Sequence, residues 1–453
     1  MHAIFNLKRL NRILAAGLCT ILLAVQLSAC KSPPKLYQME YSGYLDTISQ
    51  FTMPSDSEAA FMDQANYFEE RLAFYHQRFT SFEPVSGITN IWTLNQSAGE
   101  NPVEVTQEIM DLLVFSQGLS EETNGAVNVT MGTVTSLWKH AQDGYSYETE
   151  TPAAPSAEAI GEALQHTNAS DLVLNPDRLT VYFTDPELQL DVGAFAKGFT
   201  AEMLANELEG RGVTSALINL GGNVRTIGDK KLETNTPWAI GIQNPARRLE
   251  EAVLAYPGWI ESQLPDETDS GGEGTEALTE GSAVPDLVPL PNLIYPTGSD
   301  SEEPGTGQPE DGTTENLPTD PSEADTDSDN RVSSEQDYLA VLNSVSSSLV
   351  TSGIYERFFI EDENLYHHII DPDTGIPAQS FQSVSVVVPH SGRADALSTA
   401  LFNMTLEEGV RFVENHENLE AVWVDLDGFI TMSSGFGDLM RTDTAPAAGT
   451  APE

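Results

Sequence analysis

The stretch Asp191-Val192-Gly193-Ala194-Phe195-Ala196-Lys197-Gly198 stands where a predicted strand gives way to a predicted helix. The apolar segment 181–192 contains the strand, which ends in a glycine turn, and residues 196–209 have helical spacing. Small residues at such a junction let backbone N–H groups and the helix N-terminus approach an anion, to which Lys197 can add a positive charge. The alternative is an ordinary tight turn with a solvated lysine. The stretch is neither a Walker A loop, which needs GxxxxGKS/T, nor GxGxxG.

Outward from this stretch, strands and helices follow one another without a regular strand–helix–strand rhythm. This mixture favours an α+β fold over a doubly wound parallel sheet. The predicted helices cover 57–79, 105–123, 394–404 and 406–415, and the predicted strands and apolar strand-like segments cover 41–51, 216–220, 238–242, 339–350, 358–360 and 383–388.

The composition excludes several classes of protein. The 453 residues include 21 Lys and Arg against 69 Asp and Glu, a net charge of -48, which argues against a nucleic-acid partner because a polyanion would be repelled. The two cysteines, Cys19 and Cys30, both lie near the start. They exclude a disulfide framework, a thiolate metal site and a cysteine nucleophile in the rest of the chain. No apolar run after residue 30 approaches the roughly 20 residues that span a bilayer.

The N-terminus has the pattern of a secretory signal. Basic residues precede the mostly apolar segment 13–27, and small residues lead to Cys30. The sequence Leu27-Ser28-Ala29-Cys30 resembles the lipobox of bacterial lipoproteins, so we expect a signal peptide over 1–29 and a lipid on Cys30. The protein would then be anchored to a membrane at its extracytoplasmic face. The alternative is an uncleaved anchor helix.

An acidic stretch separates two ordered parts of the chain. Residues 261–330 contain nineteen Asp and Glu but no Lys or Arg, with abundant Gly, Pro, Ser and Thr. Such a composition cannot bury enough apolar surface to offset the entropy of ordering, so we expect a disordered insertion over 261–335. The insertion would split one domain into 41–260 and 336–440. The remaining segments would be a tether at 30–40 and a disordered tail at 441–453.

Three further motifs contain residues that could take part in binding or catalysis. Asn219-Leu220-Gly221-Gly222-Asn223 is a glycine turn, and Thr351-Ser352-Gly353 is a second small-residue segment. In His367-His368-Ile369-Ile370-Asp371-Pro372-Asp373-Thr374-Gly375, a histidine can act as a general base near neutral pH. Neighbouring strand residues face opposite sides, so one histidine of the pair would face a given site. A surface or core histidine is the alternative.

The segment Arg393-Ala394-Asp395-Ala396-Leu397-Ser398-Thr399 opens a predicted helix. Asp395 and Thr399 are four residues apart and lie on one helix face, where a carboxylate and a hydroxyl can bind Mg²⁺ together with water and substrate phosphates. Ser398 lies beside them. The alternative is that Asp395 caps the helix and Thr399 packs against a strand.

Taken together, these motifs resemble those of the ApbE-type flavin transferases (FAD:protein FMN transferases). The resemblance rests on DVGAFAKG, NLGGN, TSGxYER, HHIIDPDTGxP and ADALSTALF in that order, with 125–133 and Leu137-Trp138. It implies an α+β core related to the tunnelling fold and a Mg²⁺-dependent reaction with FAD as donor. FMN would be transferred to a threonine of a target flavoprotein, with release of AMP.

The resemblance also assigns residues. Asp395, Thr399 and the Ala194 carbonyl would bind Mg²⁺, and Ser398 stands where some members have a carboxylate. His368 would be the base that acts on the acceptor threonine, and Phe82 would lie near the flavin. The FAD site would be lined by Ala126, Val127, Asn128, Asp191, Lys197 and Ile370. One departure is Leu45-Asp46-Thr47, where members often have Met-Gly-Thr.

Other functions use the same residues. An FAD pyrophosphatase would transfer FMN to water, and a non-catalytic lipoprotein would only bind FAD. A solute-binding lipoprotein is suggested by the anchor alone. For the transferase, we expect the acceptor to be an exported flavoprotein with an FMN-binding domain at the same membrane face.

Overall fold

The computed structural model describes residues 33–146, 153–232, 234–255, 337–361 and 364–441. The predicted signal peptide, Cys30 and almost all of the predicted insertion and tail lie outside these ranges. Helices and antiparallel sheets are mixed, as the α+β prediction expects, and every strand pairing among the described residues is antiparallel. Within the described part, no helix combines the length and apolar character needed to span a membrane.

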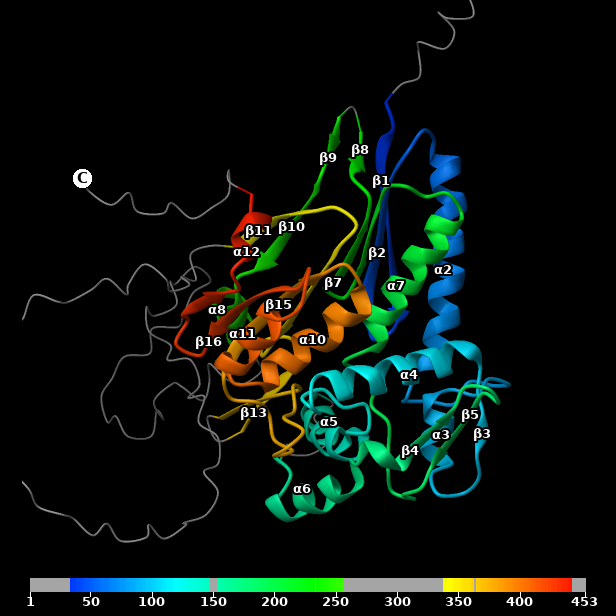
Figure 1. Ribbon diagram of the computed structural model, residues 1–453, viewed down its shortest axis with the longest axis vertical. Coiled ribbons are helices and arrows are strands. Elements are labelled where there is room, and N and C mark those ends of the chain that lie inside the picture. Colours follow the sequence, from blue (N-terminus) through cyan, green and yellow to red (C-terminus); the bar gives the residue numbers. More distant parts are fainter. Residues whose placement is uncertain (1–32, 147–152, 233, 256–336, 362–363, 442–453) are drawn as a thin grey trace, which may run out of the picture.

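An eight-stranded sheet forms the centre of the molecule (Figure 1). In spatial order its strands are β1 (Lys35–Tyr44), β2 (Thr47–Ser55), β6 (Ala216–Leu220), β7 (Asn223–Ile227), β12 (Ser348–Gly353), β15 (Phe381–Val388), β16 (Glu420–Asp425) and β17 (Ile430–Met432). The pairing of β7 with β12 joins strands from the two sides of the undescribed segment 256–336.

Side chains alternate between two apolar cores on the two faces of this sheet. In β16, Ala421 and Trp423 belong to the larger core, whereas Val422 and Val424 belong to a smaller one. This alternation follows from the two-residue period of a strand. All eight residues of β15 are buried because both faces of this strand are covered.

Helices cover the face with the larger core. They are α2 (Glu58–Phe79), α7 (Ala196–Gly210), α10 (Ser391–Asn403) and α11 (Leu406–Glu414), and Figure 1 shows α7 beside α2 and α10 across the middle of the sheet. The Ser57 hydroxyl caps α2 by accepting a hydrogen bond from the Ala60 N–H. The predicted apolar stripe of α2 is confirmed as buried: Phe61, Ala65, Phe68, Leu72 and Tyr75.

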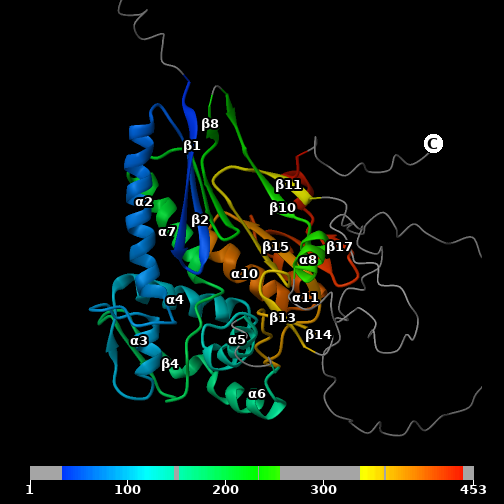
Figure 2. The same cartoon turned by 180° about the vertical axis from the view of Figure 1, so that it is seen from behind.

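The smaller core is covered by a two-stranded sheet of β10 (Trp238–Gln243) and β11 (Tyr338–Ser344). These strands pair antiparallel, and after β10 the chain forms α8 (Pro245–Leu254) before the undescribed residues 256–336. Phe436 and Leu439 of α12 (Phe436–Leu439) belong to this smaller core. The buried Leu249 and Val253 of α8, which is labelled in Figure 2, belong to the larger core.

A group of shorter elements packs at one end of the sheet (Figures 1 and 2). Trp138 and Tyr366 stack in a third apolar cluster within it. The group comprises α3 (Ile91–Gln96), α4 (Gln107–Glu122), α5 (Gly132–Ser146), α6 (Ala157–Ala163), η1 (Leu164–His166), η2 (Ala169–Asp171), β3 (Val103–Glu104), β4 (Leu172–Asn175), β5 (Thr180–Phe183), β13 (Phe358–Glu361) and β14 (Asn364–His367). The small ribbon β8 (Lys230–Lys231) and β9 (Asn235–Thr236) extends from the opposite end.

The structure corrects four sequence predictions. The single strand expected over 41–51 is a hairpin of β1 and β2, joined by Leu45 and Asp46, both in the left-handed region with φ of 50° and 52°. Because β1 starts at Lys35, it occupies part of the expected tether 30–40. The strand expected within 181–192 ends at Phe183, eight residues before Asp191, and the apolar segment 339–350 is divided between β11 and β12.

Candidate active site

Two helix N-termini meet at the centre of the candidate site. The Asp395 carboxylate, on α10, accepts a hydrogen bond of 2.8 Å from the Gly198 N–H in the first turn of α7. Asp395 therefore caps the neighbouring helix, whereas the cap of its own helix is His390. This differs from the alternative in which Asp395 caps α10. A carboxylate at a helix N-terminus is stabilised by the free N–H groups there.

Burial works against the charge of Asp395. The residue is 4% exposed, and desolvation raises the pKa of its carboxyl, while Lys197 and the Gly198 N–H oppose that change. The Lys197 ammonium also donates to the Gly193 carbonyl over 3.4 Å. Burial therefore outweighs these favourable contacts and disfavours the ionised form of the Asp395 carboxyl.

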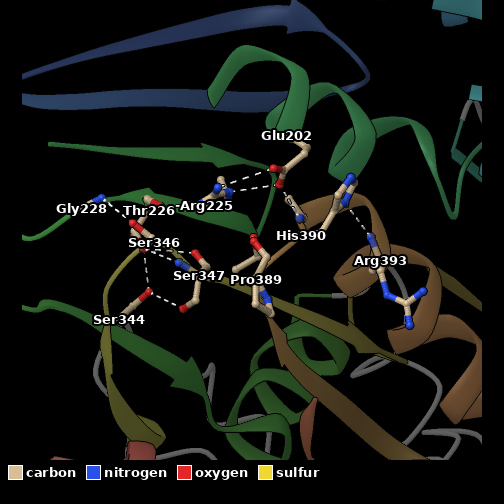
Figure 3. A network of polar contacts seen from close by, with 12 residues as sticks. Glu202, Arg225, Thr226, Gly228, Ser344, Ser346, Ser347, Pro389, His390 and Arg393 are labelled. Atoms are coloured by element: carbon tan, nitrogen blue, oxygen red, sulfur yellow. Dashed lines mark hydrogen bonds and ion pairs between the residues drawn. The ribbon is translucent and has the colours of Figure 1, made fainter. Parts of the chain in front are cut away.

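A buried ion pair between Glu202 and Arg225 links α7 to β7 (Figure 3). The Glu202 carboxylate, on α7, accepts from Arg225 Nε at 3.0 Å and from the Ser391 N–H at 2.7 Å. Side chains of Glu202 and Arg225 are at most 8% exposed. Because one carboxylate contacts both β7 and the first residue of α10, it fixes the start of α10 against α7.

Of the other predicted metal ligands, Ser398 and Thr399 follow Asp395 on α10, whereas Ala194 precedes α7. Thr399 is half-buried one turn further along α10, and Ala194 lies in the turn that precedes α7. The Ser398 hydroxyl lies 2.8 Å from the Asp395 carbonyl, to which it donates, and 2.8 Å from the Ser352 hydroxyl.

This donor set fits a magnesium ion better than a transition metal. It offers one carboxylate, hydroxyls and a carbonyl, and each of these groups would bind a metal through oxygen. Mg²⁺ prefers oxygen ligands and usually completes its coordination with water and substrate phosphates. No cluster of three or more His, Cys, Asp or Glu suited to a metal occurs in the described part of the chain. Burial raises the pKa of Asp395, and a cation bound there would oppose this by favouring the ionised carboxylate.

The two adjacent histidines have different environments, although His368 lies just beyond β14, which ends at His367, so strand alternation does not account for the difference. His367 is 2% exposed; its Nε2 donates to the Ala378 carbonyl at 2.8 Å, and its Nδ1 accepts from the Ile369 N–H at 3.2 Å. Burial lowers the pKa of His367 to about 4, so this ring is a neutral part of the core. His368 is exposed, and its Nδ1 lies 3.3 Å from the Arg357 carbonyl.

The surroundings of His368 favour its neutral form. Desolvation by the surrounding protein lowers the pKa of His368, and the charges of Arg357 and Lys197 act in the same direction. The residue keeps an exposed face, so solvent limits the size of this lowering. A neutral imidazole with a solvent-facing nitrogen can accept a proton from a hydroxyl.

Two predicted FAD-lining segments are joined by a residue that the sequence analysis did not identify. The Asn403 side-chain amide donates to the Ala126 carbonyl at 3.0 Å and to the Ile370 carbonyl at 3.1 Å. Asn403 follows the ADALSTALF motif directly, which is the signal that could have indicated it. Val127 and Ile370 are themselves buried, so these segments contribute mainly backbone groups and apolar surface.

Asn128 and Asp191 shape their own loops. The Asn128 amide donates to the Thr167 carbonyl at 3.0 Å, and its oxygen accepts from the Thr130 N–H at 3.0 Å. The Asp191 carboxylate accepts from the Gly193 N–H at 2.7 Å, which forms the turn before α7. This turn follows an extended segment without strand pairing, and not the strand that the sequence predicts.

Phe82 lies in the loop after α2, with 53% of its surface exposed. The Lys139 ammonium, on α5, is 4.8 Å from the centre of its ring. An exposed aromatic ring of this kind is available for stacking with a planar ligand.

Comparisons with known proteins identify the same family as the sequence motifs. The sequence model described as the ApbE family matches residues 45–263 and 320–423. An FAD:protein FMN transferase of Klebsiella pneumoniae (strain 342) is 24% identical over 347 residues, which cover 76% of this chain and 78% of that protein. One of Treponema pallidum (strain Nichols) is 27% identical over 362 residues, which cover 77% of this chain and 74% of that protein.

Solved structures show the same fold. The ApbE protein of Thermotoga maritima has a TM-score of 0.63 and 22% sequence identity, covering 90% of this chain and all of that one. The apo form of the flavinyl transferase ApbE from Pseudomonas stutzeri has a TM-score of 0.60 and 18% identity, covering 90% of this chain and 97% of that one.

Proposed function

The chain belongs to the ApbE family, and from this premise we propose that it is an FAD:protein FMN transferase. It transfers FMN from FAD to a threonine hydroxyl of a target flavoprotein and releases AMP, in a reaction that depends on Mg²⁺. The observation that carries this proposal is the charge of Lys197, which acts on both His368 and Asp395, while Asp395 accepts a hydrogen bond from the Gly198 N–H.

The reaction needs no nucleophile from the enzyme. The threonine oxygen forms a bond to the phosphorus of the FMN half of FAD, and the P–O bond of the anhydride to AMP breaks. AMP leaves with the electron pair, and the threonine proton passes to Nε2 of His368. Such phosphoryl transfer requires in-line positioning, neutralisation of negative charge and a proton acceptor.

Asp395, Thr399 and the Ala194 carbonyl would bind the magnesium ion, with Ser398 beside them. A bound Mg²⁺ neutralises charge on the phosphate oxygens and on the leaving phosphate. Lys197 adds a second positive charge at the same helix N-terminus, where free backbone N–H groups also favour an anion. These residues orient the diphosphate so that its FMN phosphorus faces the acceptor hydroxyl near His368.

The remaining FAD contacts would come from the loop after α4, the start of α7 and the end of β14. Ala126, Val127 and Ile370 offer backbone and apolar groups that Asn403 holds together. Asn128 and Asp191 fix the turns on either side, and Phe82 offers an aromatic surface for the flavin.

Hydrolysis of FAD is a second candidate, favoured by one observation. The exposed face of His368 can accept a proton from water as well as from a threonine. Residues and metal would be the same, and the acceptor alone would differ. A non-catalytic FAD-binding protein is a third candidate, for which His368 and Asp395 would be dispensable.

The location of the protein is part of the proposal. A lipid on Cys30 would anchor it at the extracytoplasmic face of a membrane, where an exported flavoprotein with an FMN-binding domain would be the acceptor. The α+β core would be related to the tunnelling fold. These statements rest on the lipobox-like sequence and on the motif resemblance.

Release of AMP distinguishes the three candidates. The chain without residues 1–30 is incubated with FAD and Mg²⁺, with and without a flavin-acceptor domain, and with EDTA or His368→Ala as controls. A transferase releases AMP only with the acceptor, and a pyrophosphatase releases it without one. Bound FAD with no AMP under any condition would contradict the proposed catalysis and support the carrier.

A further inference from the structure

We propose that Arg357 is the positioning residue for His368: its carbonyl fixes the tautomer of the ring, and its guanidinium holds a positive charge beside it. The proposal rests on the function proposed above, in which His368 is the base. Arg357 belongs to the Thr351–Arg357 motif (TSGIYER), to which the sequence analysis assigns no role.

The carbonyl of Arg357 accepts two hydrogen bonds from the same residue. The His368 backbone N–H donates to it at 3.2 Å, and His368 Nδ1 lies 3.3 Å away. A carbonyl oxygen can only accept, so Nδ1 carries the proton in the neutral ring. The lone pair is then on Nε2, and this nitrogen is the one that can take a proton from the acceptor hydroxyl.

The guanidinium of Arg357 is tied to a different part of the sheet. Its Nη2 donates to the Asp46 carbonyl at 3.2 Å, in the turn between β1 and β2. The strand that follows this turn contacts the glycine motif, because the Gly221 N–H donates to the Ile48 carbonyl of β2 at 3.2 Å. An exposed arginine would otherwise sample many rotamers, so this bond restricts where its charge lies.

The charged and titratable groups that act on His368 come from three elements. They are Arg357 before β13, Lys197 on α7 and His367 on β14, and each one lowers the pKa of His368. Among the described groups that act on it there is no carboxylate. His166 shows the contrast, because its bond to Asp185 raises the pKa of that imidazole.

The functional consequence concerns the acidic side of the pH range. A positive charge near an imidazole disfavours the imidazolium, so His368 remains a neutral base to a lower pH than an ordinary histidine. Arg357 would extend the active range toward acid. It would do so without contact with the substrate, through the ring that it orients.

Two substitutions distinguish the effect of the Arg357 charge on His368 from the effect of the Arg357 carbonyl. Arg357→Gln removes the charge but keeps the backbone carbonyl, and Arg357→Lys keeps the charge. We measure the titration of His368 in the full chain by NMR with labelled histidine, and the acidic limb of the pH–rate profile. We expect Arg357→Gln to move both midpoints to higher pH, by on the order of 0.5 pH unit for an exposed charge. Arg357→Lys should stay near the parent.

The tautomer is read from the ¹⁵N shifts of the neutral ring. The proposal expects a protonated Nδ1 in the parent and in both variants. Arg411→Gln, which removes an exposed arginine paired with Glu407 on α11, is the matched control and should change neither quantity. A protonated Nε2, or an unchanged His368 midpoint in Arg357→Gln, would overturn the proposal.

The NMR measurement does not depend on turnover. If the chain binds FAD without transferring FMN, the proposed function fails while the tautomer and midpoint still test Arg357. If transfer occurs and the midpoint is unchanged, only the role of Arg357 fails. A loss of activity with an unchanged acidic limb would likewise count against it, because a purely structural defect lowers the rate at every pH.

Discussion

The Asp395 carboxylate accepts a hydrogen bond from the Gly198 N–H at 2.8 Å, although 197 positions separate the two residues in the chain. This bond brings together two motifs that the sequence presents separately, the glycine turn before α7 and the start of α10. It places a buried carboxylate, a lysine and a helix N-terminus in one site. The candidate active site depends on how closely these two helices approach.

Gly198 permits that approach because it has no side chain. A Cβ at this position would lie 2.4 Å from Asp395 Cβ and 2.5 Å from the Ser391 carbonyl oxygen. We expect Gly198→Ala to lower the free energy of unfolding by about 1–3 kcal/mol and to abolish activity. Urea unfolding and an FAD turnover assay measure the two effects.

The control for this substitution is Gly118→Ala. Gly118 is exposed in α4, and a Cβ there would meet nothing within 4 Å. This alanine should raise stability by about 0.5–1 kcal/mol, since glycine is a poor helix former. Equal stability losses in the two variants would contradict the close-contact explanation.

Asp395→Asn should separate stability from function. Burial raises the pKa of the Asp395 carboxyl above that of the unfolded chain, so its ionised form costs stability at neutral pH. Without Mg²⁺, we expect the asparagine variant to be more stable by on the order of 1 kcal/mol and inactive. The stability gain should disappear as the pH falls below the ordinary range of an aspartate, where both states are protonated.

Thermal unfolding between acidic and neutral pH, with and without Mg²⁺, measures this difference. Asp438→Asn, at an exposed position in α12, is the control and should have little effect. If Asp395→Asn were less stable than the parent in metal-free neutral buffer, this would contradict the claim that the buried, ionised carboxylate destabilises the folded chain.

The pair of Glu122 and Arg393 should give a pH-dependent contribution to stability. Its two hydrogen bonds, of 2.7 and 2.6 Å, hold the end of α4 to the start of α10. The bond to Arg393 lowers the pKa of Glu122, so its stabilisation is present above the ordinary pKa of a glutamate. It is lost as the pH falls through the lowered, folded-state pKa.

We therefore expect Glu122→Gln to cost about 1 kcal/mol at neutral pH and almost nothing in strong acid. Glu407→Gln breaks a more exposed pair with Arg411 and should cost nothing measurable. Denaturant titrations at several pH values give the comparison. A cost for Glu122→Gln that did not depend on pH would show that packing, and not the ion pair, is responsible.

Removal of residues 265–330 should leave activity intact. The strands that flank the undescribed segment, β10 and β11, pair directly with each other, from Trp238 with Ser344 to Gln243 with Tyr338. A shorter connection can therefore join them without disturbing the sheet. Circular dichroism and turnover of the shortened chain test this, and a failure to obtain folded protein would contradict the prediction of a dispensable insertion.

Local patterns predicted much of the fold. The helix at 58–79 and the strand at 216–220 appear as expected, because each has a clear apolar period. The β1–β2 hairpin was missed, since its turn is Leu45-Asp46 and not the Asn-Gly or Asp-Gly pair that signals two left-handed residues. The apolar residues before Asp191 pack without strand pairing, which composition alone does not reveal.

The motifs located the site residues but not their connections. Asn403 joins Ala126 to Ile370 only through tertiary contacts. Glu202 has the sequence pattern of an ordinary helical glutamate, yet it is buried against Arg225 and the start of α10. Buried charges of this kind depend on partners far away in the chain, so a single sequence does not indicate them.

The most direct test of the proposed function is the intact mass of an acceptor flavoprotein domain after incubation with this protein, FAD and Mg²⁺. The transferase account predicts that the acceptor gains the mass of an FMN-phosphoryl group on one threonine. The gain should be absent with EDTA, with His368→Ala, or when that threonine is replaced by valine. Release of AMP with an unchanged acceptor mass, across several flavoprotein acceptors, would contradict transfer to protein and favour hydrolysis of FAD.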